Sequence, residues 1–121
     1  MKKKREYGDY FDDIIDAMKE IENFVKGMNY DDFINDKKTV FAVERGIEIV
    51  GEATKNIPKS IRNKYPEIPW KDMAGMCDRI SHVYHHVDLE LVWEVTKQEI
   101  PSLKVMLSGI LAELTDENID K

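Results

Sequence analysis

Hydrophobic residues recur three and four positions apart along nearly the whole chain, and this spacing is typical of helices that bury one face. One stripe runs through the first 27 residues and ends near Gly27, and a second occupies residues 40–54. No alternation of apolar and polar residues competes with them. The two stripes, which predict two long helices, are Phe11, Ile14, Ile15, Met18, Ile21 and Val25, then Val40, Val43, Ile47, Val50 and Thr54.

The residues around the second stripe indicate where that helix begins and how it packs. Asp36 is placed to cap its N-terminus. Small residues are interleaved with the stripe and would let another helix approach closely; they are Ala42, Gly46, Gly51 and Ala53. Pro58 and Pro66 then frame residues 59–65, where only one or two short turns are expected.

Two further helices are expected in the second half of the chain. Pro69 can open one whose stripe is Met73, Met76, Cys77, Ile80 and Tyr84. Asp88 is placed to cap the last long helix, in which Pro101 predicts a kink or a short break. The stripe of that helix is Leu89, Val92, Trp93, Thr96, Ile100, Leu103, Leu107, Ile110, Leu111 and Leu114. Because Leu89, Trp93, Leu103 and Leu107 offer more apolar surface than a small bundle buries alone, a two-fold dimer is expected.

Together these patterns predict an all-α bundle of four to five helices, formed by a single domain over residues 1–121 with a frayed tail at about 115–121. The 121 residues are 42% hydrophobic and 35% charged, as in an ordinary globular protein. The net charge of −6 argues against binding nucleic acid through a generally basic surface. A single cysteine excludes an internal disulfide, and no apolar run approaches the length of a membrane span, so a cytoplasmic protein is expected.

Charge is uneven along the chain. Residues 55–71 hold five basic residues, Lys55, Lys59, Arg62, Lys64 and Lys71, against Glu67 alone. Such a run is usually a solvated face, and the functional alternative is a loop that faces phosphate.

All three histidines and the only cysteine fall within residues 77–86. A metal site is one reading, because Asp78, His82 and His86 are spaced by four; however, the cap expected at Asp88 puts His86 in a turn, and no metal is expected. A cysteine nucleophile with a histidine base is rejected, because Cys77 and His82 are about 140° apart around a helix. The third reading is acid–base chemistry on phosphate by His82 with cationic help from Arg79, against the plain alternative of a polar helix end.

Two separated motifs resemble one known family. The segment "GMCDRISHVYHHVDLELVWEVTKQEIPSLK" resembles the C-terminal half of the HepT-like toxins of the HEPN superfamily, and "FAVERGIEIVGEATKNIP" resembles the second helix of that family. The resemblance covers roughly residues 8–114. It implies an all-α homodimer that acts as a metal-independent, cofactor-free ribonuclease toxin, paired with a nucleotidyltransferase antitoxin of the minimal MNT type.

The family motif is R-x4-H-x-Y, with two copies facing a cleft between subunits. Its histidine falls on His82 and its tyrosine on Tyr84, whereas its arginine position falls on Cys77. Arg79 lies two positions on, about 200° around the helix, and would need a shifted geometry. Three explanations stay open: a naturally weakened or inactive member, an arginine-to-cysteine variant made or selected because the active toxin is harmful, and a protein that uses Arg79 differently.

The resemblance also implies that the antitoxin transfers AMP groups from ATP to Tyr84, which would place negative charge and bulk beside His82. Arg45, Glu48 and Glu52 on the second helix are candidate supporting residues of the site, or only its polar face. The expected function is therefore that of a toxin acting as an RNA endonuclease, with activity reduced or lost because of Cys77. The alternative is a non-catalytic helical dimer that binds a nucleotidyltransferase partner.

Overall fold

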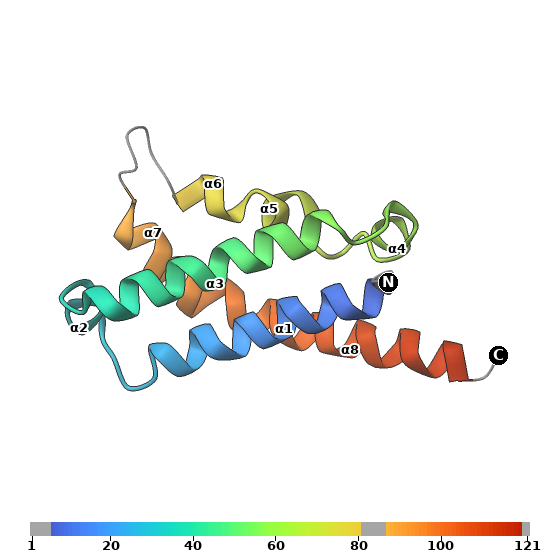
Figure 1. Ribbon diagram of the computed structural model, residues 1–121, viewed down its shortest axis with the longest axis horizontal. Coiled ribbons are helices and arrows are strands. Elements are labelled where there is room, and N and C mark those ends of the chain that lie inside the picture. The colour runs from blue at the N-terminus through green and yellow to red at the C-terminus, as the bar shows by residue number, and fades with distance from the viewer. Residues whose placement is uncertain (1–5, 81–86, 120–121) are drawn as a thin grey trace, which may run out of the picture.

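The computed structural model describes residues 6–80 and 87–119, and the described residues form helices without a β-strand. Figure 1 shows the chain running along the long axis in α1, back in α3, forward again in α5 and α6, and back once more through α7 and α8. The all-α bundle expected from the hydrophobic pattern is thus confirmed. The bundle has four antiparallel layers, formed by α1, by α3, by α5 with α6, and by α7 with α8. The third layer consists of the two short helices α5 and α6.

The first two predicted helices are confirmed as α1 (Tyr7–Phe24) and α3 (Lys37–Lys55). Every residue of their two hydrophobic stripes is buried. As expected, the Asp36 carboxylate caps α3 by accepting a hydrogen bond from the Thr39 amide at 3.1 Å. The chain leaves the end of α1 through Gly27, whose φ of +79° lies in the left-handed region that glycine adopts at little cost.

The close approach expected at the small residues of α3 is confirmed at two glycines. A Cβ atom on Gly46 would lie 2.5 Å from Cγ1 of Ile21, a core residue of α1. A Cβ atom on Gly51 would lie 3.3 Å from the carbonyl oxygen of Ala74 in α5. Therefore α1 packs on one side of α3 and α5 on the other, at a separation set by residues that lack a side chain.

Two short helices occupy the turns of the bundle. The pattern did not predict α2 (Tyr30–Ile34), a helix that Asn29 caps by accepting from the Asp32 amide at 2.8 Å. Its Phe33 is buried, with its ring centroid 5.2 Å from that of Trp93. The short turn expected between Pro58 and Pro66 is present as α4 (Lys59–Lys64).

The helix expected to start at Pro69 and include Tyr84 is not continuous. Pro69 does cap a helix, α5 (Trp70–Ala74), but that helix ends at Gly75 and α6 (Met76–Ile80) begins anew. Glycine is the weakest helix former after proline, which explains a break at this position. Cys77 is consequently only half-buried on α6, and not part of the core stripe with Met76 and Ile80.

The last predicted helix is confirmed, with Asp88 accepting from the Leu91 amide at 3.1 Å as its cap. It comprises α7 (Leu89–Glu94), a wider π-helical turn η2 (Val95–Glu99) and α8 (Ile100–Ile119). The irregularity expected at Pro101 is this wide turn, because proline has no N–H to offer the carbonyl of Lys97 and its ring crowds that carbonyl.

Helix α8 packs against α1. Leu103 and Leu107 are both buried within the chain, so they do not provide the surplus apolar surface from which a dimer was expected. The helix continues through Ile119, beyond the expected start of a frayed tail. None of the helices in the described residues is long and apolar enough to cross a membrane.

Candidate functional site

His82 and Tyr84, like the remaining histidines, lie outside the described residues. The nearest described residues on the two sides are held together, because the Asp88 amide donates a hydrogen bond to the Ile80 carbonyl at 2.8 Å. The end of α6 and the start of α7 therefore lie close to each other (Figure 1).

Cys77 lies on α6 against the polar face of α3. Burial raises the pKa of its thiol, and the nearby carboxylates of Glu48, Asp78 and Glu52 raise it further, while Lys55 acts in the opposite direction. A thiol with a raised pKa is protonated near neutral pH, and the thiolate is the nucleophilic form. This electrostatic environment is the reverse of the one that activates a catalytic cysteine.

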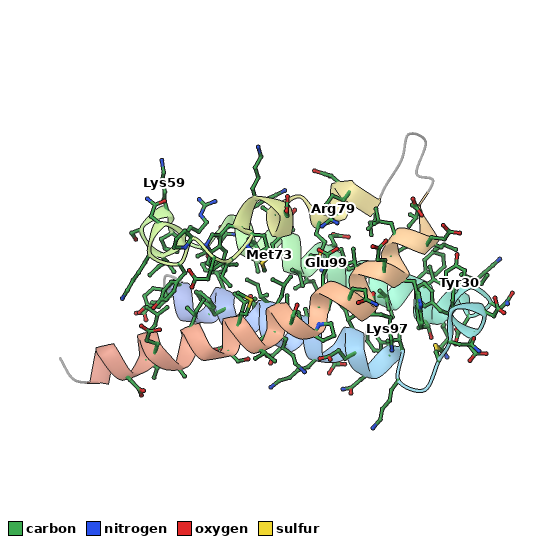
Figure 2. All side chains as sticks on the ribbon, turned by 180° about the vertical axis from the view of Figure 1, so that it is seen from behind. Tyr30, Lys59, Met73, Arg79, Lys97 and Glu99 are labelled. Carbon is green, nitrogen blue, oxygen red and sulfur yellow. The ribbon has the colours of Figure 1, made fainter. Side chains whose placement is uncertain are left out.

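The guanidinium of Arg79 binds the carboxylate of Glu99 through two parallel hydrogen bonds. Nη1 donates to Oε1 and Nη2 donates to Oε2, each at 3.1 Å, and the two side chains are about one-third exposed. Figure 2 shows Arg79 on α6 and Glu99 on the facing helix pointing toward each other. The hydrogen bonds with Glu99 raise the pKa of Arg79. Both terminal nitrogens of Arg79 are therefore engaged on a carboxylate of the same chain.

The three candidate supporting residues of α3 divide into two roles. Glu48 and Glu52 lie close enough to Cys77 to affect its thiol. Arg45 instead donates to Glu48 at 2.8 Å, and Glu52 pairs with Lys55 at 3.5 Å; all four side chains are more than half exposed. The structure thus brings position 77 together with two carboxylates of α3, while Arg45 is held one turn away along the same helix.

Glu99 is a site residue that the sequence pattern did not single out. It lies twenty residues from Arg79, so no local spacing relates the two.

The described residues contain no group of three or more His, Cys, Asp or Glu side chains that could hold a metal ion. Asp78 is exposed on α6, and the histidines that would complete a set with it are outside the described part of the chain.

Comparisons with known proteins identify the family. Residues 14–110 match the family model "Ribonuclease HepT-like". The chain is 48% identical to the "Probable ribonuclease HepT" of Thermococcus cleftensis over 84% of this chain and 92% of that protein. It is 46% identical to the "Putative RNase MJ1216" of Methanocaldococcus jannaschii over 95% of this chain and 97% of that protein. No solved structure gives a significant match. This all-α chain therefore belongs to the HepT-like family of the HEPN superfamily.

Proposed function

We propose that this protein is a metal-independent RNA endonuclease of the HepT type whose motif arginine is missing. In this reaction the 2′-hydroxyl of a ribose attacks the adjacent phosphate, and His82 transfers the proton as acid or base. The observation that carries the proposal is the match to HepT-like proteins over the stretch that holds the HxY part of the motif. The relatives named as ribonucleases supply the reaction class.

The charge-stabilising role in this reaction is unfilled. A phosphoryl transition state requires positive charge, and a guanidinium can hold a phosphate through two parallel hydrogen bonds. Arg79 is the nearest arginine to His82 in sequence, but its two terminal nitrogens are bound to Glu99. Cys77 carries no charge and has its pKa raised. This arrangement supports the proposal that the chain cleaves RNA at a reduced rate or not at all.

Position 77 would accept an arginine. The side chain there is half-buried at the edge of α6 rather than enclosed in the core, so a longer side chain has a path to solvent. Glu48 and Glu52 lie beside it and would stabilise a cation. The two glutamates thus become candidates for orienting the motif arginine in members that have one.

The test is an RNA cleavage assay on Cys77→Arg. If the arginine is the missing part, cleavage should increase by about a hundredfold to a thousandfold, the usual effect of one charge-stabilising group. His82→Ala on the Cys77→Arg background should abolish the gain, because proton transfer is lost. Arg79→Gln on the same background is the matched control and should keep the gain, because Arg79 is committed to Glu99.

Efficient cleavage by the natural chain, unchanged in Cys77→Arg, would contradict the proposal that the arginine's role is unfilled. A Cys77→Arg variant that is folded by circular dichroism but still inactive would favour a second function. That function is a non-catalytic helical dimer that binds a nucleotidyltransferase, and the replacement of the motif arginine by Cys77 is the observation in its favour.

We also propose that the protein is the toxin of a cytoplasmic toxin–antitoxin pair, modified at Tyr84 by its MNT-type nucleotidyltransferase. Incubation with that enzyme and ATP should add the mass of AMP to the peptide that holds residues 80–90. Tyr84→Phe keeps the ring and removes the acceptor hydroxyl, so mass spectrometry should detect no addition. Undiminished modification of Tyr84→Phe would show that another residue is the acceptor.

A further inference from the structure

A pocket lies beside the wide helical turn η2, on the side that faces away from Arg79. Its volume is about 610 Å³, within the range of small-molecule sites, and it is formed where the end of α1 meets η2 and the start of α8. Figure 2 shows Glu99 directed toward α6 and Lys97 directed toward α1, so the two residues leave the same turn on opposite sides. The pocket is thus separated from the Arg79–Glu99 pair by roughly the 10–12 Å diameter of one helix.

The charges around this pocket reverse those of the molecule as a whole. Four lysines line it, Lys19 and Lys26 from the α1 side and Lys97 and Lys104 from the other, against the single carboxylate of Glu22. The whole chain has a net charge of −6. Glu22 is already paired with Lys104, so it does not neutralise the remaining three lysines.

Helix-end electrostatics account for only part of this cluster. A lysine just past the C-terminus of α1, as Lys26 is, favours the helix dipole. Lys97 and Lys104 come from η2 and α8 and also lie near that end, but the roughly half unit of negative charge at a helix C-terminus does not balance four lysines. Lys97 lies over the ring of Trp93, with Nζ 5.4 Å from the ring centroid, and the residue is exposed.

Thr96 gives the pocket an unsatisfied polar group. The residue is 1% exposed and lines the pocket, and its hydroxyl oxygen has no hydrogen-bond partner in the structure. A buried hydroxyl without a partner costs about 1–3 kcal/mol and is uncommon in native proteins. The hydroxyl oxygen is shielded from solvent, so the lysines are the groups that present donors to a ligand.

We propose that this pocket binds phosphate groups of the RNA strand, as a contact outside the cleavage motif. The inference rests on the proposed ribonuclease function for the identity of the strand. Lysine ammonium groups are donors suited to phosphate oxygens. No aromatic side chain lines the pocket in the described residues, so it offers no surface on which a base would stack. The pocket therefore recognises the backbone without reading the sequence, and it holds the strand across one helix from the Arg79–Glu99 pair.

The experiment measures binding of a labelled single-stranded 2′-O-methyl RNA by fluorescence anisotropy at several salt concentrations. This RNA lacks the attacking hydroxyl, so binding is observed without cleavage. Lys26→Gln/Lys97→Gln removes one cation from each wall. Each lost phosphate contact lowers the salt-dependence slope by about 0.7 on a single strand, so the slope should fall by about 1.4 and affinity by about 25-fold at 0.1 M salt. Lys37→Gln/Lys38→Gln, an equal charge change on exposed residues of α3, should have little effect.

Thr96→Val is a control at the pocket wall that changes no charge. The substitution removes an unpartnered hydroxyl and nearly preserves the shape, so the melting temperature should not fall. RNA affinity should also be unchanged, because the hydroxyl oxygen is shielded from solvent. Unchanged affinity in Lys26→Gln/Lys97→Gln would overturn the proposal.

Three further outcomes are decisive. If Lys59→Gln/Lys71→Gln weakens RNA binding more than the pocket variants do, the strand follows the basic segment at residues 55–71, and the proposal is wrong. If calorimetry shows that pyrophosphate binds in a manner dependent on Lys26 and Lys97 while RNA binding is unaffected, the site belongs to a free phosphorylated ligand, and the RNA assignment is wrong. Pocket-dependent binding of the uncleavable RNA, without cleavage by Cys77→Arg, would support the pocket and refute the ribonuclease.

Discussion

At the scale of single residues, Cys77 combines two properties that determine its chemistry. We propose that it occupies the arginine position of the HepT-like motif, and its thiol lies near enough to carboxylates of α3 for them to raise its pKa. The same carboxylates that would stabilise an arginine there disfavour a thiolate. This position is therefore suited to a cation and unsuited to a nucleophilic cysteine.

The pH dependence of Cys77 alkylation follows from this environment. Because the pKa of the thiol is raised, iodoacetamide should react more slowly at pH 8 with the folded protein than with the urea-unfolded chain, and the rate should rise as pH increases. Glu48→Gln/Glu52→Gln removes two causes of the raised pKa and should speed the reaction at pH 8. The rate measured by mass spectrometry should not change in Glu20→Gln/Glu113→Gln, which alters exposed glutamates elsewhere. Equal rates in the two double variants would show that the α3 carboxylates do not act on Cys77.

At the scale of elements, the position of α3 decides the geometry of the site. Gly46 sets its distance from α1, and Gly51 sets its distance from α5, which leads directly to α6 and Cys77. The opposite side of the site depends on η2, which carries Glu99 beside Arg79 and Thr96 at the pocket. The glycines of α3 and the wide turn η2 thus position Cys77 and the Arg79–Glu99 pair.

A pair of glycine substitutions tests the first of these features. Gly46→Ala should lower the free energy of unfolding by about 1–3 kcal/mol, because the new Cβ overlaps the buried side chain of Ile21. Gly109→Ala in α8 is the matched control: nothing lies within 4 Å of its Cβ position, so the better helix former should raise stability by about 0.5–1 kcal/mol. Urea denaturation followed by circular dichroism measures both. A stabilising Gly46→Ala would mean that α1 and α3 are not in close contact.

At the scale of the whole molecule, the apolar surface left exposed differs from the surface expected. Leu103 and Leu107 are buried in the core. In contrast, Phe41 is 67% exposed and Val105 is 70% exposed, and the neighbouring Met106 is also exposed. Singly exposed apolar residues are common, but adjacent ones on a long helix are favourable positions for association. We therefore retain a two-fold dimer as a proposal and assign α8, through Val105 and Met106, as the surface to test.

The dimer would bring two copies of His82 toward one cleft and would supply both an acid and a base. Light scattering after gel filtration at micromolar concentration should give about twice the chain mass of 14.1 kDa. Val105→Lys should shift the mass toward the monomer if α8 forms the interface, whereas Phe41→Lys serves as the comparison on α3. A mass of 14.1 kDa for the natural chain would contradict the dimer.

Much of the fold could be predicted from the sequence because it depends on short-range rules. The stripes that end at Val25 and at Thr54 bury their residues as their spacing indicates, and Asp36 and Asp88 cap the helices that follow them. Helical periodicity and capping involve residues only three or four positions apart, so each can be recognised locally. The motif residues His82 and Tyr84 were also recognised locally, and their places in the site stay predictions.

The remaining features required the tertiary structure because they join residues far apart in the chain. Arg79 meets Glu99 across twenty residues, Cys77 meets the carboxylates of α3, and the lysines of the pocket come from two helices at opposite ends of the chain. Charge attraction and burial act through space, and no spacing along the sequence encodes such distances. The sequence by itself determined an all-α chain of the HepT-like family, because helical periodicity is local. Only the packing of α3, α6 and η2 decided that Arg79 is engaged by Glu99 and that the thiol of Cys77 lies near carboxylates of α3.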